Sequence, residues 1–361
     1  MIIFRYLAKE VYLTLIALTA ILMLIFMSNQ FVQYLNRAAS GTIPGVIILK
    51  LMALEIPNLM GLLLPLGFYF ALLLAYGRLY ADSEMTVLHA SGYSPNSLLK
   101  HSFIMASMVA VLVGYLVIWL SPEIALARAK LLRSAGIQTL IQTIIPGRFH
   151  AVNHGLNVFY VQSMTRSHTQ AEHVFLARRT MKDGTWQWDI LWADKAFAEV
   201  DAKTGEDYLV LQNGKAYQGI PGKADYQVAE FHQYQARLAQ PTIEGLNEDI
   251  RTYPTASLLP INNPDLQKAA ELQWRFSVPI MVFVLTLIAV PLCRLNPRSG
   301  KYAKLLPAII IYILYANFMF VARDAISSGK LPTWLGMWWL HALVFILGIF
   351  LLWRNHKKLA A

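Results

Sequence analysis

The chain has 361 residues, of which 56% are apolar and only 14% are charged, with a formal net charge of +10 and a mean hydropathy of +0.44. In soluble domains roughly a quarter of the residues are charged. This composition therefore argues against a wholly water-soluble protein and indicates that lipid solvates much of the chain. The charges gather in short junctions and in one central block, roughly residues 121–271, whose composition is that of a soluble domain.

Missing motifs exclude several classes of function. The chain has no G-x-x-x-x-G-K-[ST] loop to cradle ATP phosphates, no H-E-x-x-H and no paired-cysteine metal spacing. Its single cysteine, Cys293, cannot form an intramolecular disulfide. The central block shows no basic patch interleaved with aromatic residues, so no nucleic-acid partner is predicted. We therefore expect no enzyme activity, catalytic residue, metal or cofactor of the chain's own.

Six windows are apolar over roughly the 20 residues that a membrane-spanning helix needs. Three precede the central block and three follow it. They run from about Val11 to Val32, Val46 to Tyr76, Phe103 to Leu120, Phe276 to Leu292, Leu305 to Val321 and Leu335 to Trp353. The sequence thus predicts an α-helical membrane protein with six transmembrane helices.

The Lys and Arg residues beside these windows set the predicted orientation. One set of short junctions carries eleven basic residues and the opposite set carries three. Because basic residues accumulate on the cytoplasmic side, both termini should be cytoplasmic and the central domain should lie outside. The predicted domains are residues 1–121 (three helices), 122–264 (the outer domain) and 265–361 (three helices).

The second span contains an acid, Glu55, together with Pro57 and Pro65. A charged side chain at the centre of a spanning helix costs about 2.5–3.5 kcal/mol on insertion scales, so Glu55 should face protein or water rather than lipid. Two readings stay open. Glu55 lines a cavity, or it lies near the outer interface and is hydrogen-bonded to a neighbouring helix.

A short helix is predicted at about residues 82–92, in the cytoplasmic junction between the second and third spans. Asp82 or Ser83 can cap it, Glu84 favours its first turn, and Gly92 can end it in left-handed geometry. Met85 and Leu88 are expected on an exposed apolar side, with Val87. Such a helix could dock into a groove of a soluble partner. The alternative is that this segment is a simple turn packed on the helix bundle of its own chain. The candidate contact residues are Asp82, Ser83, Glu84, Met85, Leu88 and His89.

The central block begins with a helical period that runs through about Gln142, and from Gly147 it changes to period two with frequent turns. The strands should form an all-β sandwich, jelly roll or open barrel. The predicted strand segments are Val158 to Val161, His173 to Leu176, Trp186 to Trp188, Ala196 to Val200, Tyr208 to Leu211 and Tyr226 to Phe231.

An apolar groove is expected inside this β domain. Four apolar residues alternate with polar neighbours and are therefore candidates to line it: Phe159, Val161, Phe175 and Phe197. An acyl chain could lie between two such apolar faces.

Four stretches of the chain resemble a known family. They are the opening residues 1–7 (MIIFRYL), residues 79–92 (LYADSEMTVLHASG), residues 270–275 (AELQWR) and residues 295–300 (LNPRSG). They are similar to motifs of the permeases of the bacterial lipopolysaccharide exporter (the YjgP/YjgQ or LptF/LptG family), and most nearly to its LptF branch. The resemblance covers the whole chain, with three spans, a β domain of jelly-roll type and three spans. The loop motifs are specific, whereas the β domain matches only in pattern.

The resemblance implies the permease subunit of an ABC transporter in the inner membrane of a Gram-negative bacterium. A second related permease (LptG-like) and a dimeric cytoplasmic ATPase (LptB-like) would complete it, with residues 82–92 coupling to the ATPase. Lipopolysaccharide would be extracted from the inner membrane and pushed into periplasmic β domains. A bitopic LptC-like protein and a periplasmic LptA-like bridge would receive it.

The resemblance also directs attention to the mouth where the lipid would enter. Relatives often carry basic residues near the outer end of the first span, but here Gln30 and Gln33 are neutral and Arg37 is the first basic residue. Arg323 lies near the outer end of the fifth span. The residues expected at the mouth are Gln30, Gln33, Arg37, Glu55 and Arg323. The alternative reading of the two arginines is that they are interfacial and bind ordinary headgroups.

Two other functions share much of this sequence pattern. A permease for another amphiphile, such as a lipoprotein, would keep the architecture and change the cargo. A membrane sensor or scaffold with an outer domain would have no transport role and no need of an ATPase.

Overall fold

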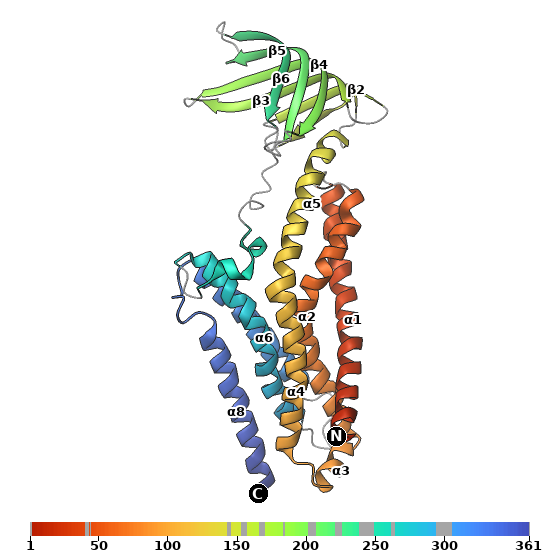
Figure 1. Cartoon of the computed structure of the whole chain (residues 1–361), viewed down its shortest axis with the longest axis vertical. Coiled ribbons are helices and arrows are strands. Elements are labelled where there is room, and N and C mark those ends of the chain that lie inside the picture. Colours follow the sequence, from red (N-terminus) through yellow and green to blue (C-terminus); the bar gives the residue numbers. More distant parts are fainter. Residues whose placement is uncertain are drawn as a thin grey trace. The chain divides into compact units, whose positions relative to one another are not determined.

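The structure is a computed structural model, and it divides the chain into two compact units (Figure 1). The helical unit comprises Met1–Val32, Leu49–Arg128 and Glu248–Ala361, and the sheet unit comprises Gln33–Ile48 and Ala129–Asn247. The division falls at 128/129 and 247/248 rather than at the predicted 122 and 264. The described residues are 2–39, 43, 45–142, 146–152, 157–165, 170–182, 185–200, 207–220, 226–237, 249–260, 264–293 and 305–360.

Long apolar helices dominate the first unit. Five helical stretches of the described chain are long and apolar enough to cross a membrane, and they contain the first five predicted spans. The sixth predicted span lies in α8 except for residues 335–337, which precede the helix, and the apolar stretch of α8, Trp338–Arg354, is shorter than the other five. The helices are α1 (Ile2–Ala39), α2 (Ile48–Ala81, after the short 3-10 helix Gly45–Ile47), α3 (Glu84–Ala90), α4 (Pro95–Gly114), α6 (Leu266–Leu292), α7 (Leu305–Ser327) and α8 (Trp338–Ala360).

The third span does not stop where the sequence predicted. From α4 the chain passes through a π-helical segment, η2 (Tyr115–Leu120), straight into α5 (Ser121–Gln142). Pro122 lies within this continuous helix, although it has no N–H to donate to the carbonyl of Ile118, four residues earlier. The wider π turn ends at Leu120, two residues before this proline, and such turns often accompany local departures from α-helical bonding.

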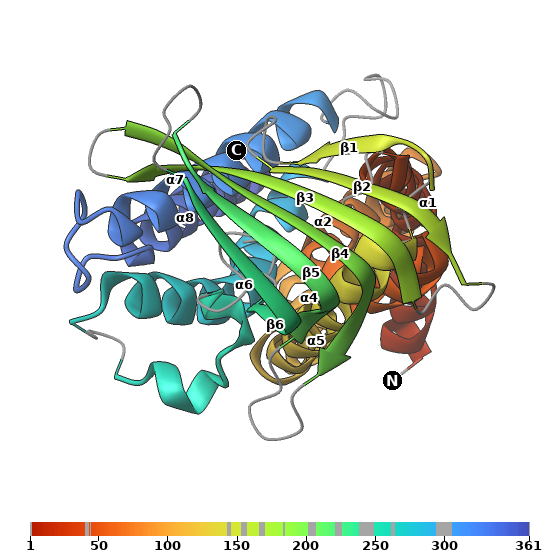
Figure 2. The same ribbon diagram turned by 90° about the horizontal axis from the view of Figure 1, so that it is seen from above.

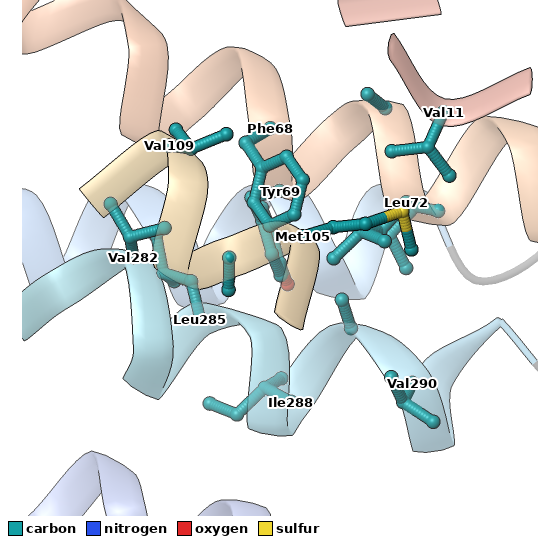
Figure 3. Close-up of a cluster of buried hydrophobic side chains, with 14 of the residues drawn as sticks. Val11, Phe68, Tyr69, Leu72, Met105, Val109, Val282, Leu285, Ile288 and Val290 are labelled. Carbon is teal, nitrogen blue, oxygen red and sulfur yellow. The ribbon is translucent and has the colours of Figure 1, made fainter. Parts of the chain in front are cut away.

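The centre of the helical unit is built around α2, α4 and α6. Figure 3 shows side chains from these helices and α1 meeting in one apolar cluster. Within the most apolar window of each helix, 78% of α6 and 67% of the α2 span are buried, but only 17% of α1 and 22% of α7. Helices α1 and α7 therefore keep apolar faces that are covered by no described part of this chain, as helices that contact lipid or another helix do.

The second unit contains one antiparallel sheet of six strands in chain order (Figure 2). The all-β expectation is confirmed. The strand order differs from a jelly roll, because each described strand pairs with its neighbour in sequence and no second sheet is formed by the described strands. The strands are β1 (Phe149–Val152), β2 (Asn157–Met164), β3 (Gln170–Lys182), β4 (Thr185–Val200), β5 (Asp207–Gly219) and β6 (Gln227–Arg237).

The five strands β2 to β6 are all longer than the predicted segments, and β1 was not predicted. The segments Trp186–Trp188 and Ala196–Val200 belong to one strand, β4, and β5 runs through Asn213-Gly214, which the sequence marks as a turn. Asn213 does adopt the left-handed conformation that the dipeptide favours, with φ 52°, but the chain continues as a strand. The preference of Asn213-Gly214 for a turn is therefore overridden by the pairing of β5 with β4 and β6.

A row of interrupted pairing crosses the sheet at this point. His173 also has a positive φ, 50°, and the ladder lacks the pairs that would join the row Gln162, His173, Asp194, Asn213 and His232. On either side of the row, residues three apart in the same strand, such as Ala171 and Val174, are buried in one cluster. The two residues between them therefore both point to the opposite face of the sheet. The alternation of side chains changes phase at this row, and it does so at the same level in neighbouring strands.

Candidate functional site

The predicted cytoplasmic helix is present as α3. Ser83 precedes it with φ 63° and makes no side-chain capping hydrogen bond, so the predicted cap is wrong for Ser83. Gly92 follows it with φ 94°, the left-handed geometry that the sequence predicted. Glu84 lies in the first turn, as predicted, and its Oε2 accepts a hydrogen bond of 2.5 Å from the hydroxyl of Tyr6 in α1.

The apolar side of α3 faces inward, which corrects the sequence prediction. Met85 is fully buried in the core of the helical unit, and Leu88 packs against that core, whereas Val87 is 67% exposed. A seven-residue helix is not stable alone, so its two apolar residues three apart are used to attach it to the bundle. The exposed surface at the beginning of α3 is therefore mainly polar, with Asp82, Ser83 and Glu84 exposed.

His89 anchors α3 rather than extending its exposed surface. Its Nδ1 lies 2.6 Å from the carbonyl oxygen of Tyr93, and its Nε2 lies 3.3 Å from the hydroxyl of Tyr80. The hydroxyl of Tyr93 lies in turn 2.6 Å from Nδ1 of His101 in α4. Burial raises the pKa of Tyr93 to about 12, so its hydroxyl keeps its proton at neutral pH. These bonds fix α3 against α2 and α4.

Helix α1 contacts both the end of α2 and the beginning of α3. Four residues after Tyr6, Glu10 forms an ion pair with Arg78 in the last turn of α2. One face of α1 therefore holds the end of α2 and the beginning of α3 together.

Glu55 faces protein. Its side chain is nearly buried; Oε2 lies 3.3 Å from Nη1 of Arg128 in α5, and Oε1 accepts a hydrogen bond of 3.2 Å from Asn58. This geometry favours the second of the two readings for Glu55, an acid bonded to a neighbouring helix.

Arg323 has partners within the helical unit. It forms an ion pair with Glu271 of α6, and its guanidinium lies 5.1 Å from the ring centroid of Trp274. The sequence reasoning missed Glu271 and its second partner Arg275, although their spacing of four within residues 270–275 is a signal for an ion pair on one helix face.

The other predicted mouth residues lie on the last turns of α1. Gln30 is half-buried and belongs to the helical unit, whereas Gln33 and Arg37 are exposed and belong to the sheet unit. Arg323 belongs to the helical unit. The two predicted arginines are therefore in different units.

The four candidate groove residues divide between the two faces of the sheet. Val161 is buried in the cluster with Val174, and Phe159, two residues earlier, points to the same face. Phe175 points the other way, and so does Phe197, which follows the buried Ala196. The four residues do not form one lining.

The opposite face of the sheet carries an aromatic row. Phe175 is paired across the strands with Tyr160 and Trp192, and its ring lies 6.4 Å from that of Phe149.

Among the described residues, no group of three or more His, Cys, Asp and Glu side chains could hold a metal ion.

The apolar helices and the attached sheet unit define a multi-pass membrane protein with a separate β domain. The model of the family "Lipopolysaccharide export system permease LptF/LptG" matches residues 5–354. The chain is 31% identical over 355 residues to the lipopolysaccharide export system permease protein LptF of Escherichia coli (strain K12), covering 98% of this chain and 95% of that protein. The same values hold for the LptF proteins of Escherichia coli O157:H7 and Shigella flexneri.

The chain therefore belongs to the lipopolysaccharide export system permease LptF/LptG family. This is a family of transport subunits. The family match and the apolar helices together identify the chain as a multi-pass protein of the inner membrane.

Proposed function

We propose that this protein is a permease subunit that moves lipopolysaccharide out of the inner membrane toward the outer membrane. The observation that carries the proposal is the family match over residues 5–354, which covers both the helical unit and the sheet unit. The apolar faces of α1 and α7 suit contact with a second, related permease and with lipid. ATP hydrolysis would come from a dimeric cytoplasmic ATPase, since the chain has no phosphate-binding loop.

The proposed topology has six spans. Helix α8 would be the sixth, and an even number returns both termini to the same side. The excess of basic residues in the junctions of that side supports a cytoplasmic location for the termini and for α3. The sheet unit would be periplasmic, where an LptC-like protein and an LptA-like bridge would receive the lipid.

The function is tested by reconstitution. The chain, co-expressed with the related permease and the ATPase, should co-purify with both, and mass spectrometry should find lipopolysaccharide in the complex. In vesicles, ATP should drive transfer of that lipid to the periplasmic acceptor proteins. Bound lipoprotein in place of lipopolysaccharide would assign another cargo, and failure to retain an ATPase would favour a sensor or scaffold.

Coupling should depend on the carboxylate of Glu84. Because Glu84 is exposed, we expect Glu84→Ala to leave the helical unit folded while lowering lipid delivery by about tenfold, the cost of losing one charge-assisted hydrogen bond. Tyr6→Phe, which removes only the bond within the chain, and Thr86→Ala on the same helix should change delivery little. Normal growth and export of Glu84→Ala in a depletion strain would contradict the role.

The face of the sheet with the buried cluster should carry the lipid. Adjacent residues of β4 provide a matched pair, because Leu191 packs against that cluster and Trp192 points to the opposite face. A photo-crosslinking residue at 191 or 159 should capture lipopolysaccharide only when ATP is hydrolysed, whereas one at 192 or 175 should not. Equal labelling at 191 and 192 would show that the lipid does not follow this face.

At the lipid mouth we propose that Arg37 binds a lipid phosphate. The guanidinium of Arg323 is engaged inside the helical unit by Glu271 and Trp274, whereas the side chain of Arg37 is exposed at the end of α1, where a phosphate can reach it. Arg37→Glu should lower the amount of co-purifying lipopolysaccharide about tenfold more than Arg37→Gln, because it adds repulsion to the lost contact. Equal lipid content in the two variants would assign the phosphate contact to the other permease.

A further inference from the structure

Two stretches of the helical unit lead to and from the sheet unit. The outgoing stretch is η2 with the first residues of α5. The returning stretch begins at Asp249 and contains the short 3-10 helices η3 (Ile250–Thr252) and η4 (Thr255–Leu258). Both stretches pack against α6.

A direct hydrogen bond joins the two stretches. Pro122 cannot donate to the carbonyl of Ile118, so this helix carbonyl needs another donor. The hydroxyl of Thr255 in η4 donates to it. The irregular helix thus uses the returning stretch to satisfy its own backbone.

Arg275 holds the returning stretch from the side of α6. Its side chain is 2% exposed. Nη1 donates to the carbonyl oxygen of Tyr253 at 2.9 Å and to the hydroxyl of Thr255 at 2.8 Å, and Nη2 donates to the carbonyl oxygen of Arg251 at 3.1 Å. Three acceptors from one short stretch match the rigid fork of an arginine, which a lysine ammonium cannot reproduce.

The same arginine continues the contacts to α7. Its Nε donates to Oε1 of Glu271 at 2.9 Å, and the other oxygen of Glu271 pairs with Arg323. One unbroken series of polar contacts therefore runs from α7 through α6 to the returning stretch, and from Thr255 to the outgoing stretch.

We propose that Arg275 and Thr255 form a clamp that fixes the spacing of the two stretches and makes it respond to α7. They are positioning residues, since the clamp acts through the segments that lead to the sheet unit. A shift of α7 against α6 would be passed through Glu271 to Arg275, and from there to Thr255 and Ile118. That this movement serves lipid delivery rests on the proposed function.

The test uses Thr255→Val, which keeps the shape of the side chain and removes both of its hydrogen bonds. Thr252→Val is the matched control, because the hydroxyl of Thr252 donates 2.8 Å within its own turn, to the carbonyl oxygen of Asp249. Arg275→Lys keeps the charge beside Glu271 and removes the fork. Spin labels on cysteines introduced at the exposed positions 119 and 257 report the spacing in the full complex, while Cys293 is buried and stays unlabelled.

The unmodified chain and Thr252→Val should give one narrow distribution of distances between the labels. Thr255→Val and Arg275→Lys should give a distribution at least twice as wide. In vesicles, the ATP hydrolysed per lipid delivered should rise about tenfold in these two variants, since losing a hydrogen bond to a charged group shifts an equilibrium by about that factor. A purely structural role would lower the yield of complex and leave this ratio unchanged.

The clamp is overturned if Thr255→Val and Thr252→Val give the same distance distribution and the same ATP per lipid while the unmodified complex delivers lipopolysaccharide normally. If the unmodified complex delivers no lipopolysaccharide, the proposed function fails instead. The widths of the distance distributions need no lipid, so they still decide whether the clamp exists.

Discussion

Replacing Glu271 with glutamine should destabilise the helical unit by about 3–5 kcal/mol, the cost of removing one partner from a buried ion pair. Glu271 is 5% exposed and lies between two arginines, Arg275 and Arg323. Without its charge, the guanidinium of Arg275 remains buried with no compensating anion. The free energy of unfolding, measured by titration with dodecyl sulfate in mixed micelles, is the quantity to compare.

Glu123→Gln is the control for this prediction, because Glu123 is an exposed acid in the first turn of α5. Its loss should change stability by no more than about 0.5 kcal/mol. The double variant Glu271→Met with Arg275→Met removes both charges and should recover part of the loss, although the backbone acceptors of the returning stretch lose their donor. Equal stability of Glu271→Gln and Glu123→Gln would show that the pairing is not needed.

The second large effect should come from Gly336→Ala in the connection between α7 and α8. Gly336 has φ 48°, and a Cβ there would lie 1.9 Å from Oε1 of Gln273. Gln273 is fully buried; its Nε2 donates to the carbonyl oxygen of Thr333 at 2.7 Å, and its Oε1 accepts from the N–H of Met337 at 3.2 Å. Backbone strain of about 1–2 kcal/mol and an unsatisfied buried amide of about 1–3 kcal/mol should add to a loss of about 3 kcal/mol.

Gly329→Ala separates the two causes. Its φ is 75°, but the nearest atom to an added Cβ is the methyl Cδ1 of Leu266, at 3.3 Å. It should therefore cost only the backbone strain, about 1–2 kcal/mol. Adding Gln273→Ala to Gly336→Ala should relieve the collision, so the double variant should be more stable than the sum of the two single changes. Strict additivity would mean that the connection moves away from Gln273.

The parts of the fold that could be predicted are those set by one sequence pattern that extends over many residues. An apolar window of about 20 residues has few alternatives to a spanning helix, so the five helices that contain these spans were found, although the helices extend up to 12 residues beyond the predicted ends. Met85 was misplaced because a seven-residue helix has too few residues for periodicity to show which side is buried. In the sheet, alternation failed at His173 and Asn213, where the left-handed backbone changes which face the next residues occupy.

The candidate site was predictable only where its contacts are local. Glu84 and Gly92 were found because caps and first turns involve neighbours in sequence. The partners of Arg275 in the returning stretch lie 20 to 24 residues earlier in the chain, and Arg323 lies 52 residues from Glu271. No spacing rule reaches that far, and a buried arginine in an apolar helix has the same sequence appearance as one at a lipid headgroup.

The row of interrupted pairing in the sheet restricts how this protein can have diverged. The change of phase occurs at matching positions of neighbouring strands, at His173, Asp194 and Asn213 among others. The gain or loss of one residue in a single strand would leave that strand out of phase with both neighbours and turn its apolar side chains to the wrong face. Differences in chain length between descendants of one ancestral sheet should therefore collect in the connections, while the stretches that cross the row keep a fixed number of residues.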